Sequence, residues 1–66
     1  MNHLACRTQA AAAERLAALA VRGHDFSPAL LDHLTRPILA AYMAPACEPT
    51  SARRIHVALD LLGLSA

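Results

Sequence analysis

The chain has 66 residues, which is enough for one small domain and excludes a second one. Hydrophobic residues make up 56% of it and aromatic residues 3%, so a core must be built from aliphatic side chains. The formal net charge of +1 is low for a protein devoted to binding nucleic acid. All the basic side chains other than histidine are arginine, which is typical of GC-rich bacterial or phage genomes.

The two cysteines, Cys6 and Cys47, could pair or stay free. The N-terminus shows no basic start followed by a long apolar run and a cleavage site, so no secretory signal is predicted. The alanine-rich run is interrupted by Glu14 and Arg15 and is too short to span a bilayer. We therefore expect a cytoplasmic protein with two free thiols and no membrane partner.

Residues 3–22 are predicted to form the first helix, because alanine is the best helix former and neither glycine nor proline interrupts the run. Gly23 is a suitable residue to end it. At about 100° per residue, one face is small and apolar. This predicted inward face consists of Ala5, Ala12, Ala13, Leu16, Leu19 and Ala20. The opposite face carries Arg7, Glu14, Arg15 and Arg22.

A second helix is predicted over residues 28–44, with Ser27 as its N-cap and Pro28 at its first position. Its predicted inward face consists of Leu30, Leu31, Leu34, Ile38, Ala41 and Tyr42. Asp32 and Arg36 form a favourable i,i+4 pair on the outer face. Pro37 interrupts the backbone bonding, so we expect this helix to be kinked or split there.

Residues 45–50 are predicted to form a turn, after which Thr50 or Ser51 caps a third helix over residues 52–62. Gly63 ends this helix. Its main apolar stripe is Ile55, Leu59 and Leu62, and a second stripe on another side is Val57, Leu61 and Leu64. Three helices joined by short loops predict an all-α, three-helix bundle.

Apolar side chains exceed what one inward stripe per helix requires, and the excess lies in the second half of the chain. Scattered apolar residues are normal on the surface of a monomer. Their clustering instead favours a homodimer, with binding to another protein, of unknown identity, as the second use of these faces. The residues expected at this protein interface are Leu39, Met43, Val57, Leu61 and Leu64.

These features predict a small regulatory or inhibitory protein that acts by protein–protein interaction, of the kind that phages and mobile elements encode. The alternative is a nucleic-acid-associated regulator that uses an arginine face. That face would consist of Arg7, Arg15, Arg22, Arg53 and Arg54. Glu14 lies within it, and no aromatic side chain is placed to stack on bases, so the first interpretation is favoured.

Metal and enzyme chemistry are not predicted. His3 and Cys6 are three residues apart, but the sequence has no CxxC or HxxxH spacing, and zinc needs three or four convergent ligands. His56 and Asp60 could share a hydrogen bond that orients the imidazole. A helix surface provides neither a deep cleft nor an oxyanion hole, so we expect a surface pair, no cofactor and no enzyme.

Overall fold

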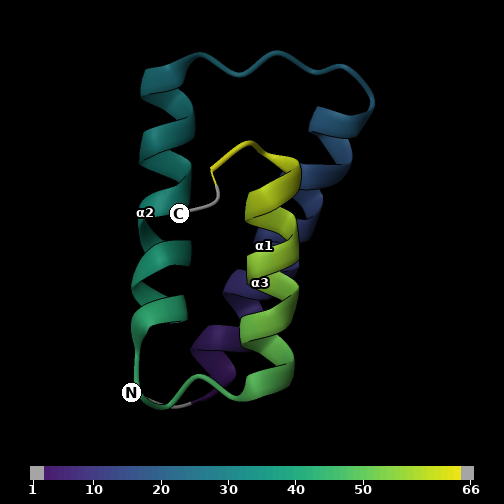
Figure 1. Cartoon of the computed structure of the whole chain (residues 1–66). Coiled ribbons are helices and arrows are strands. Elements are labelled where there is room, and N and C mark those ends of the chain that lie inside the picture. Colours follow the sequence, from purple (N-terminus) through teal and green to yellow (C-terminus); the bar gives the residue numbers. More distant parts are fainter. Residues whose placement is uncertain (1–2, 65–66) are drawn as a thin grey trace.

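The computed structural model of the protein describes residues 3–64 and shows three α-helices, with no β-strand in this range (Figure 1). The helices are α1 (His3–Val21), α2 (Pro28–Met43) and α3 (Pro49–Leu61). The chain runs up, down and up, so α1 and α3 point in the same direction. The molecule measures 32 × 20 × 20 Å. The predicted all-α, three-helix bundle is confirmed.

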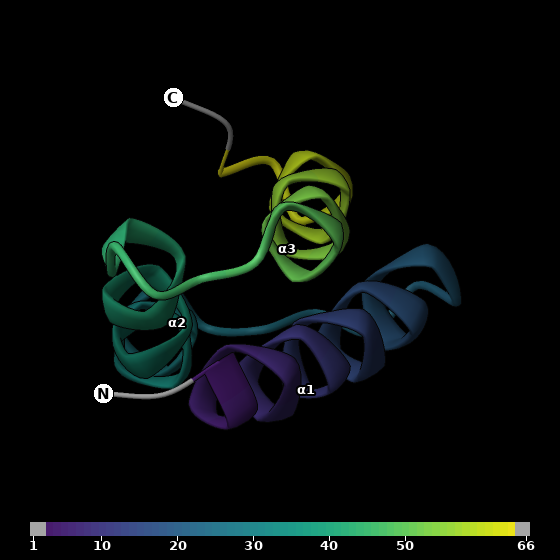
Figure 2. The same ribbon diagram turned by 90° about the horizontal axis from the view of Figure 1, so that it is seen from below.

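α2 and α3 both lie on one side of α1 (Figure 2). α1 packs most extensively against α3, less against α2, and the α2–α3 packing is the sparsest. The core therefore centres on the buried face of α1. Its buried apolar members are Cys6, Ala10, Ala13 and Ala17 of α1, Ile38 of α2, and Ile55, Ala58 and Leu59 of α3.

The buried face of α1 differs from the prediction. Ala13 is buried as expected and Leu16 is partly buried, but Leu19 is 40% exposed. Cys6 and Ala17 are buried in its place. Most side chains of α1 are alanine, so hydrophobicity barely distinguishes one side of the helix from another. The face that packs is lined mainly by alanine, whose small side chain allows α3 to approach closely.

The two glycines end α1 and α3 as predicted. Gly23 has φ +92° and Gly63 has φ +78°, a left-handed conformation that glycine adopts without steric cost. The backbone bonds run from Gly23 to Ala20, His24 to Leu19, Gly63 to Asp60 and Leu64 to Leu59, at 2.8–3.0 Å. Both ends are therefore Schellman motifs, in which late carbonyls of the helix find donors.

α2 begins as predicted, because the Leu30 N–H donates to Ser27 Oγ at 3.2 Å. The helix then continues through Pro37 to Met43, so a split at Pro37 is wrong. Pro37 is exposed, whereas Ile38 directly after it is buried in the core and keeps the second half in place. Leu30 was expected to face inward, but it is exposed, since it lies at the edge of the buried stripe.

α3 begins three residues earlier than predicted. Pro49 is its first residue, and Glu48 occupies the N-cap position in an extended conformation. Proline suits the first helical position because its fixed φ is helical and its missing N–H has no partner there. Ser51 is therefore inside the helix, where its buried hydroxyl donates to Glu48 Oε1 at 2.9 Å.

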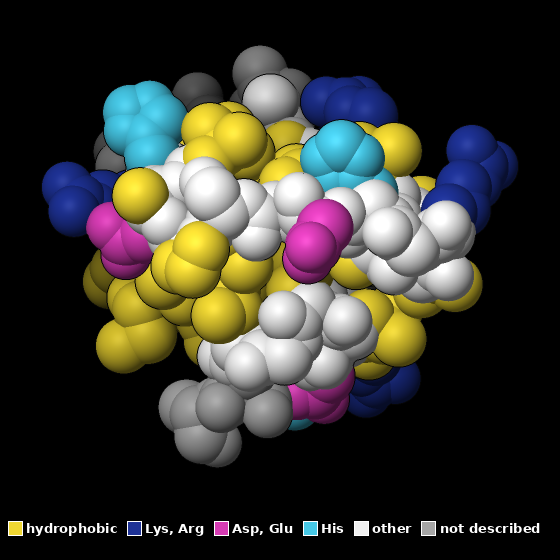
Figure 3. Space-filling view, turned by 90° about the horizontal axis from the view of Figure 1, so that it is seen from above, with side chains coloured by type: hydrophobic (Ala, Val, Ile, Leu, Met, Phe, Trp, Pro, Cys, Tyr) yellow, Lys and Arg dark blue, Asp and Glu magenta, His cyan; other side chains and the backbone are white. Residues whose placement is uncertain are grey.

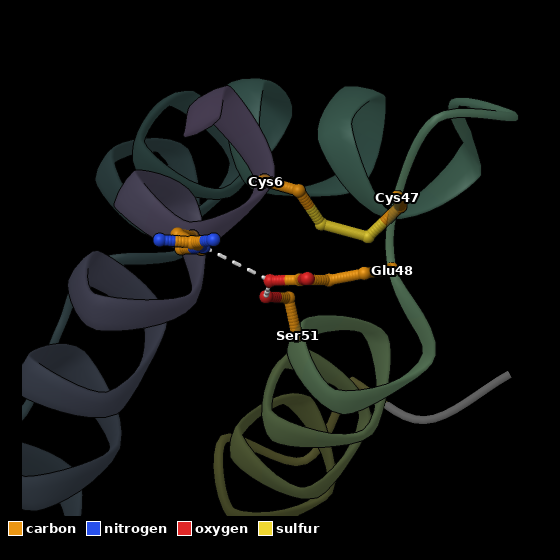
Figure 4. The surroundings of a disulfide bond; sticks show 5 residues. Cys6, Cys47, Glu48 and Ser51 are labelled. Carbon is orange, nitrogen blue, oxygen red and sulfur yellow. Dashed lines mark hydrogen bonds and ion pairs between the residues drawn. A yellow bond between two sulfur atoms is a disulfide. The ribbon is translucent and has the colours of Figure 1, made fainter. Parts of the chain in front are cut away.

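Cys6 and Cys47 form a disulfide, with their Cα atoms 5.5 Å apart (Figure 4). The expectation of free thiols, which rested on the compartment, is therefore wrong. The bond fastens α1 to the loop before α3. Arg7 Nε donates to Glu48 Oε1 at 3.1 Å beside it, so the same two segments are also joined by an ion pair.

Candidate functional site

An open groove of about 590 Å³ runs along the seam between α1 and α3. We call it the α1/α3 groove. Its apolar lining consists of Ala17, Ala18, Val21, Val57, Ala58 and Leu61. Its charged lining consists of Glu14, Arg22, Arg53 and Arg54. Both helices thus contribute an apolar floor and a charged border.

The groove follows from the residue sizes along the seam. Ala17 and Ala58 are both buried where α1 meets α3, and their methyl groups fill little space. The larger side chains stand at the sides instead, with Val21 69% exposed and Val57 and Leu61 more than half exposed. The result is an apolar groove surface that nothing in residues 3–64 covers. Apolar side chains also reach the surface between charged ones at the upper end of the bundle, most widely on the side of α2 (Figure 3).

One ion pair crosses the groove between α1 and α3. Arg54 donates from Nη2 to Glu14 Oε1 at 2.6 Å and from Nε to Glu14 Oε2 at 3.0 Å. These hydrogen bonds hold the pKa of Glu14 below its usual value and raise the pKa of Arg54. The guanidinium binds both carboxylate oxygens at once, so this bidentate pair fixes the position of α1 along α3.

Arg22 and Arg53 make no ion pair with any residue in the described range. Arg22 follows the last residue of α1, and Arg53 lies in the first turns of α3. The border of the groove therefore has three arginines and one glutamate, and that glutamate is already paired. The groove is bordered by net positive charge.

The five residues predicted for a protein interface are all exposed, but they do not gather in one place. Val57 and Leu61 line the α1/α3 groove. Leu39 and Met43 belong to α2, which does not line it, and Leu64 follows the end of α3. Sequence reasoning left Val21 and the alanine floor out of the predicted set. Ala17 and Val21 lie one helical turn apart, and this spacing could have indicated that they share a face of α1.

The five predicted arginines also separate. Arg7 is paired with Glu48, and Arg54 is paired with Glu14. Arg15, Arg22 and Arg53 make no ion pair within the described range, and two of these border the groove. The continuous arginine face predicted from the sequence is thus interrupted by ion pairs.

His56 and Asp60 form the predicted surface pair, with Nε2 and Oδ2 3.6 Å apart. His56 also contacts α2, because its Nδ1 lies 3.4 Å from the Tyr42 hydroxyl oxygen. The imidazole is thus held from both sides, but it is exposed and lies outside the α1/α3 groove. These contacts fasten α3 to α2 at a place where the two helices otherwise pack sparsely.

Within residues 3–64, no three histidine, cysteine or acidic side chains converge where they could hold a metal ion. Cys6 is held in the disulfide, and the side chain of His3 lies outside the described part of the molecule. No helix in the described range is long and apolar enough to cross a membrane. No protein-family model, curated protein or solved structure matches the chain.

Proposed function

We propose that the protein is a small, non-catalytic regulator that binds another protein by taking one of its helices into the α1/α3 groove. The observation that supports this is the apolar groove itself, where Val21, Val57 and Leu61 stand exposed beside a floor of alanine. Contiguous exposed apolar surface marks interaction sites on small soluble proteins. Binding would cover this surface, and the regulatory or inhibitory effect would fall on the partner.

A helix is the occupant that fits this groove best. Small residues on a floor allow the backbone of a third helix to approach closely. The groove is bordered on both sides by helices, so an amphipathic helix could lay its apolar face between them. An extended strand would gain less, because two helices offer no free backbone edge for it to pair with.

The nucleic-acid alternative has less support. Two of its five arginines, Arg7 and Arg54, are paired with carboxylates of the same chain. Contacts to phosphate require cations that are free to replace counterions. Binding to DNA that collapses at modest salt concentration would favour this alternative over the groove.

The disulfide bears on where the protein works. Disulfides form and persist in oxidising compartments and are rare in the cytoplasm. The Cys6–Cys47 bond therefore favours an oxidising compartment over the cytoplasmic location expected from the sequence. The homodimer stays a prediction. Leu39 and Met43 lie outside the groove and form the surface left for self-association, and light scattering after size exclusion tests it.

Affinity capture from extracts of the encoding organism tests the proposed function. The wild-type protein should retain one or a few proteins that Leu61→Glu loses, because a buried carboxylate would disrupt the groove. Leu39→Glu is the matched control and should retain the same proteins. Circular dichroism checks that both variants stay helical. Equal retention by Leu61→Glu and the wild type would contradict the proposal.

A further inference from the structure

We infer that the partner helix is acidic, and that it carries one carboxylate near each end of its apolar stripe, one paired with Arg22 and the other with Arg53. The inference rests on the proposed function, and it limits the partner of this protein to one chemical class, an acidic amphipathic helix. Three features support it: the unpaired charge at the border of the groove, the spacing of the two arginines, and the lack of two acidic residues within any one of the three described helices of this chain.

The charge at the border is the first feature. Within residues 3–64, Glu14 is the only acidic residue lining the groove, and Arg54 binds both of its oxygens. Arg22 and Arg53 therefore remain to attract carboxylates from outside. An apolar occupant would displace water from the groove, and charge pairs at its edge would then be screened less than on an open surface. Complementary charge of this kind selects the partner and orients it.

The distance between the two arginines is the second feature. α1 and α3 run in the same general direction (Figure 1) but are inclined to each other (Figure 2), and the Glu14–Arg54 pair marks the level at which they are joined. Arg22 lies eight residues beyond Glu14, and Arg53 lies one residue before Arg54. At 1.5 Å per residue, this offset places the backbones of Arg22 and Arg53 up to about 13 Å apart along the groove, a span of about nine residues of a helix lying in it.

The two arginines also lie on opposite sides, since Arg22 directly follows α1 and Arg53 belongs to α3. Nine residues of an α-helix make about two and a half turns, so positions i and i+9 point to opposite sides of the helix axis. Carboxylates at i and i+9 would therefore flank a central apolar stripe and reach both arginines. The spacing and the sidedness of the arginines agree on the same pattern.

A second copy of this chain does not supply that pattern, which is the third feature. Each of the three described helices contains a single acidic residue: Glu14 in α1, Asp32 in α2 and Asp60 in α3. Two grooves placed face to face would also set net positive borders against each other, which disfavours association. The partner is therefore a different protein.

Three synthetic helical peptides of equal length test this inference with the oxidised full chain. They share one leucine and alanine stripe and carry glutamate, glutamine or lysine at positions i and i+9. Isothermal titration should show that affinity falls from the Glu peptide to the Gln peptide to the Lys peptide. The Glu peptide should bind roughly three- to tenfold more tightly than the Gln peptide. A fourth peptide, with its glutamates at i and i+4, should bind like the Gln peptide.

Variants of the protein assign the effect to the two arginines. Arg22→Gln combined with Arg53→Gln should abolish the preference for glutamate, whereas Arg15→Gln, outside the groove, should keep it. If the wild type bound all peptides with equal affinity and Leu61→Glu bound none of them, the inference would be overturned and the proposed function would stand. Absence of binding by every peptide would count against both. Self-association that depends on Arg22 and Arg53 would overturn the inference in favour of a second copy.

Discussion

Ser27 shows how one polar side chain defines the start of an element. Its hydroxyl oxygen accepts the Leu30 N–H, one of the amides that a helix start leaves without a partner. Ser27→Ala should lower the free energy of unfolding by about 1 kcal/mol, measured by urea denaturation. Ser27→Asp also offers an oxygen acceptor and should keep most of the stability. An alanine variant as stable as the wild type would show that the cap contributes nothing.

Glu14 and Arg54 predict a dependence of stability on pH. The hydrogen bonds from Arg54 lower the pKa of Glu14 in the folded state, so the folded protein binds this proton less readily than the unfolded chain. The pair therefore stabilises the protein above the pKa of an unfolded glutamate, and the contribution is lost as the pH falls below about 4. Glu14→Gln should be less stable than the wild type at pH 7, and the difference should shrink toward pH 3.

A double-mutant cycle checks the origin of this effect. Glu14→Gln and Arg54→Gln together should cost little more than either change alone, because each removes the same interaction. Both side chains are substantially exposed, so solvent screening keeps the contribution small. A difference between wild type and Glu14→Gln that stays constant from pH 7 to pH 3 would place the effect elsewhere.

For single residues, the sequence predicts the chemical character of a side chain better than it predicts which other side chains it contacts. Val57 and Leu61 were recognised from helical spacing, and the structure places both in the groove. Arg7 and Arg54 were recognised as basic, but their partners are about 40 residues away in sequence. Local periodicity carries no information about such contacts, because only the packing of α1 on α3 brings these residues together.

α1 is a helix whose side chains are small enough that its position depends on close contact. Ala13 is fully buried where α1 meets its neighbours, and Ala18 is exposed in the groove. Ala13→Leu should therefore overpack the core and cost about 1–3 kcal/mol, measured by urea denaturation.

Ala18→Leu makes the same chemical change outside the core and is the matched control. It should leave stability nearly unchanged, and it should weaken peptide binding because the new side chain would occupy the groove. Equal destabilisation by the two substitutions would mean that the assigned face of α1 is wrong.

Helix boundaries were predictable where a cap or a glycine marks them, and less so elsewhere. Ser27, Gly23 and Gly63 gave the correct ends within a residue. The start of α3 was missed because proline is favoured both in turns and at the first position of helices, and Pro49 is the first residue of this helix. The buried face of α1 was missed because alanine lies on every side of this helix, so its faces hardly differ in hydrophobicity.

For the whole molecule, the sequence predicts the class and the order of the elements but not the covalent link between them. Length, helix-forming composition and two short loops lead to the three-helix bundle that the structure shows. Whether Cys6 and Cys47 pair depends on distance in the folded chain, which periodicity does not report. The weak α2–α3 packing and the small size of the core explain why a covalent link matters here.

The disulfide should supply a large part of the total stability. A 66-residue domain has roughly 3–10 kcal/mol to lose, and its core has few large side chains. Cys6 and Cys47 are 41 residues apart, and closing a loop of that length stabilises the folded state by about 4 kcal/mol through the entropy of the unfolded chain. Cys6→Ala combined with Cys47→Ala should lower the free energy of unfolding by that order.

Chemical reduction separates the bond from the substitutions. Dithiothreitol should destabilise the wild type about as much as the double substitution does, and it should leave the double variant unchanged. Mass spectrometry after alkylation should find no modified thiol in the oxidised protein and two after reduction. A reduced wild type that unfolds at the same urea concentration as the oxidised form would show that helix packing alone holds α1 against the loop before α3. The bundle would then be stable in a reducing compartment as well.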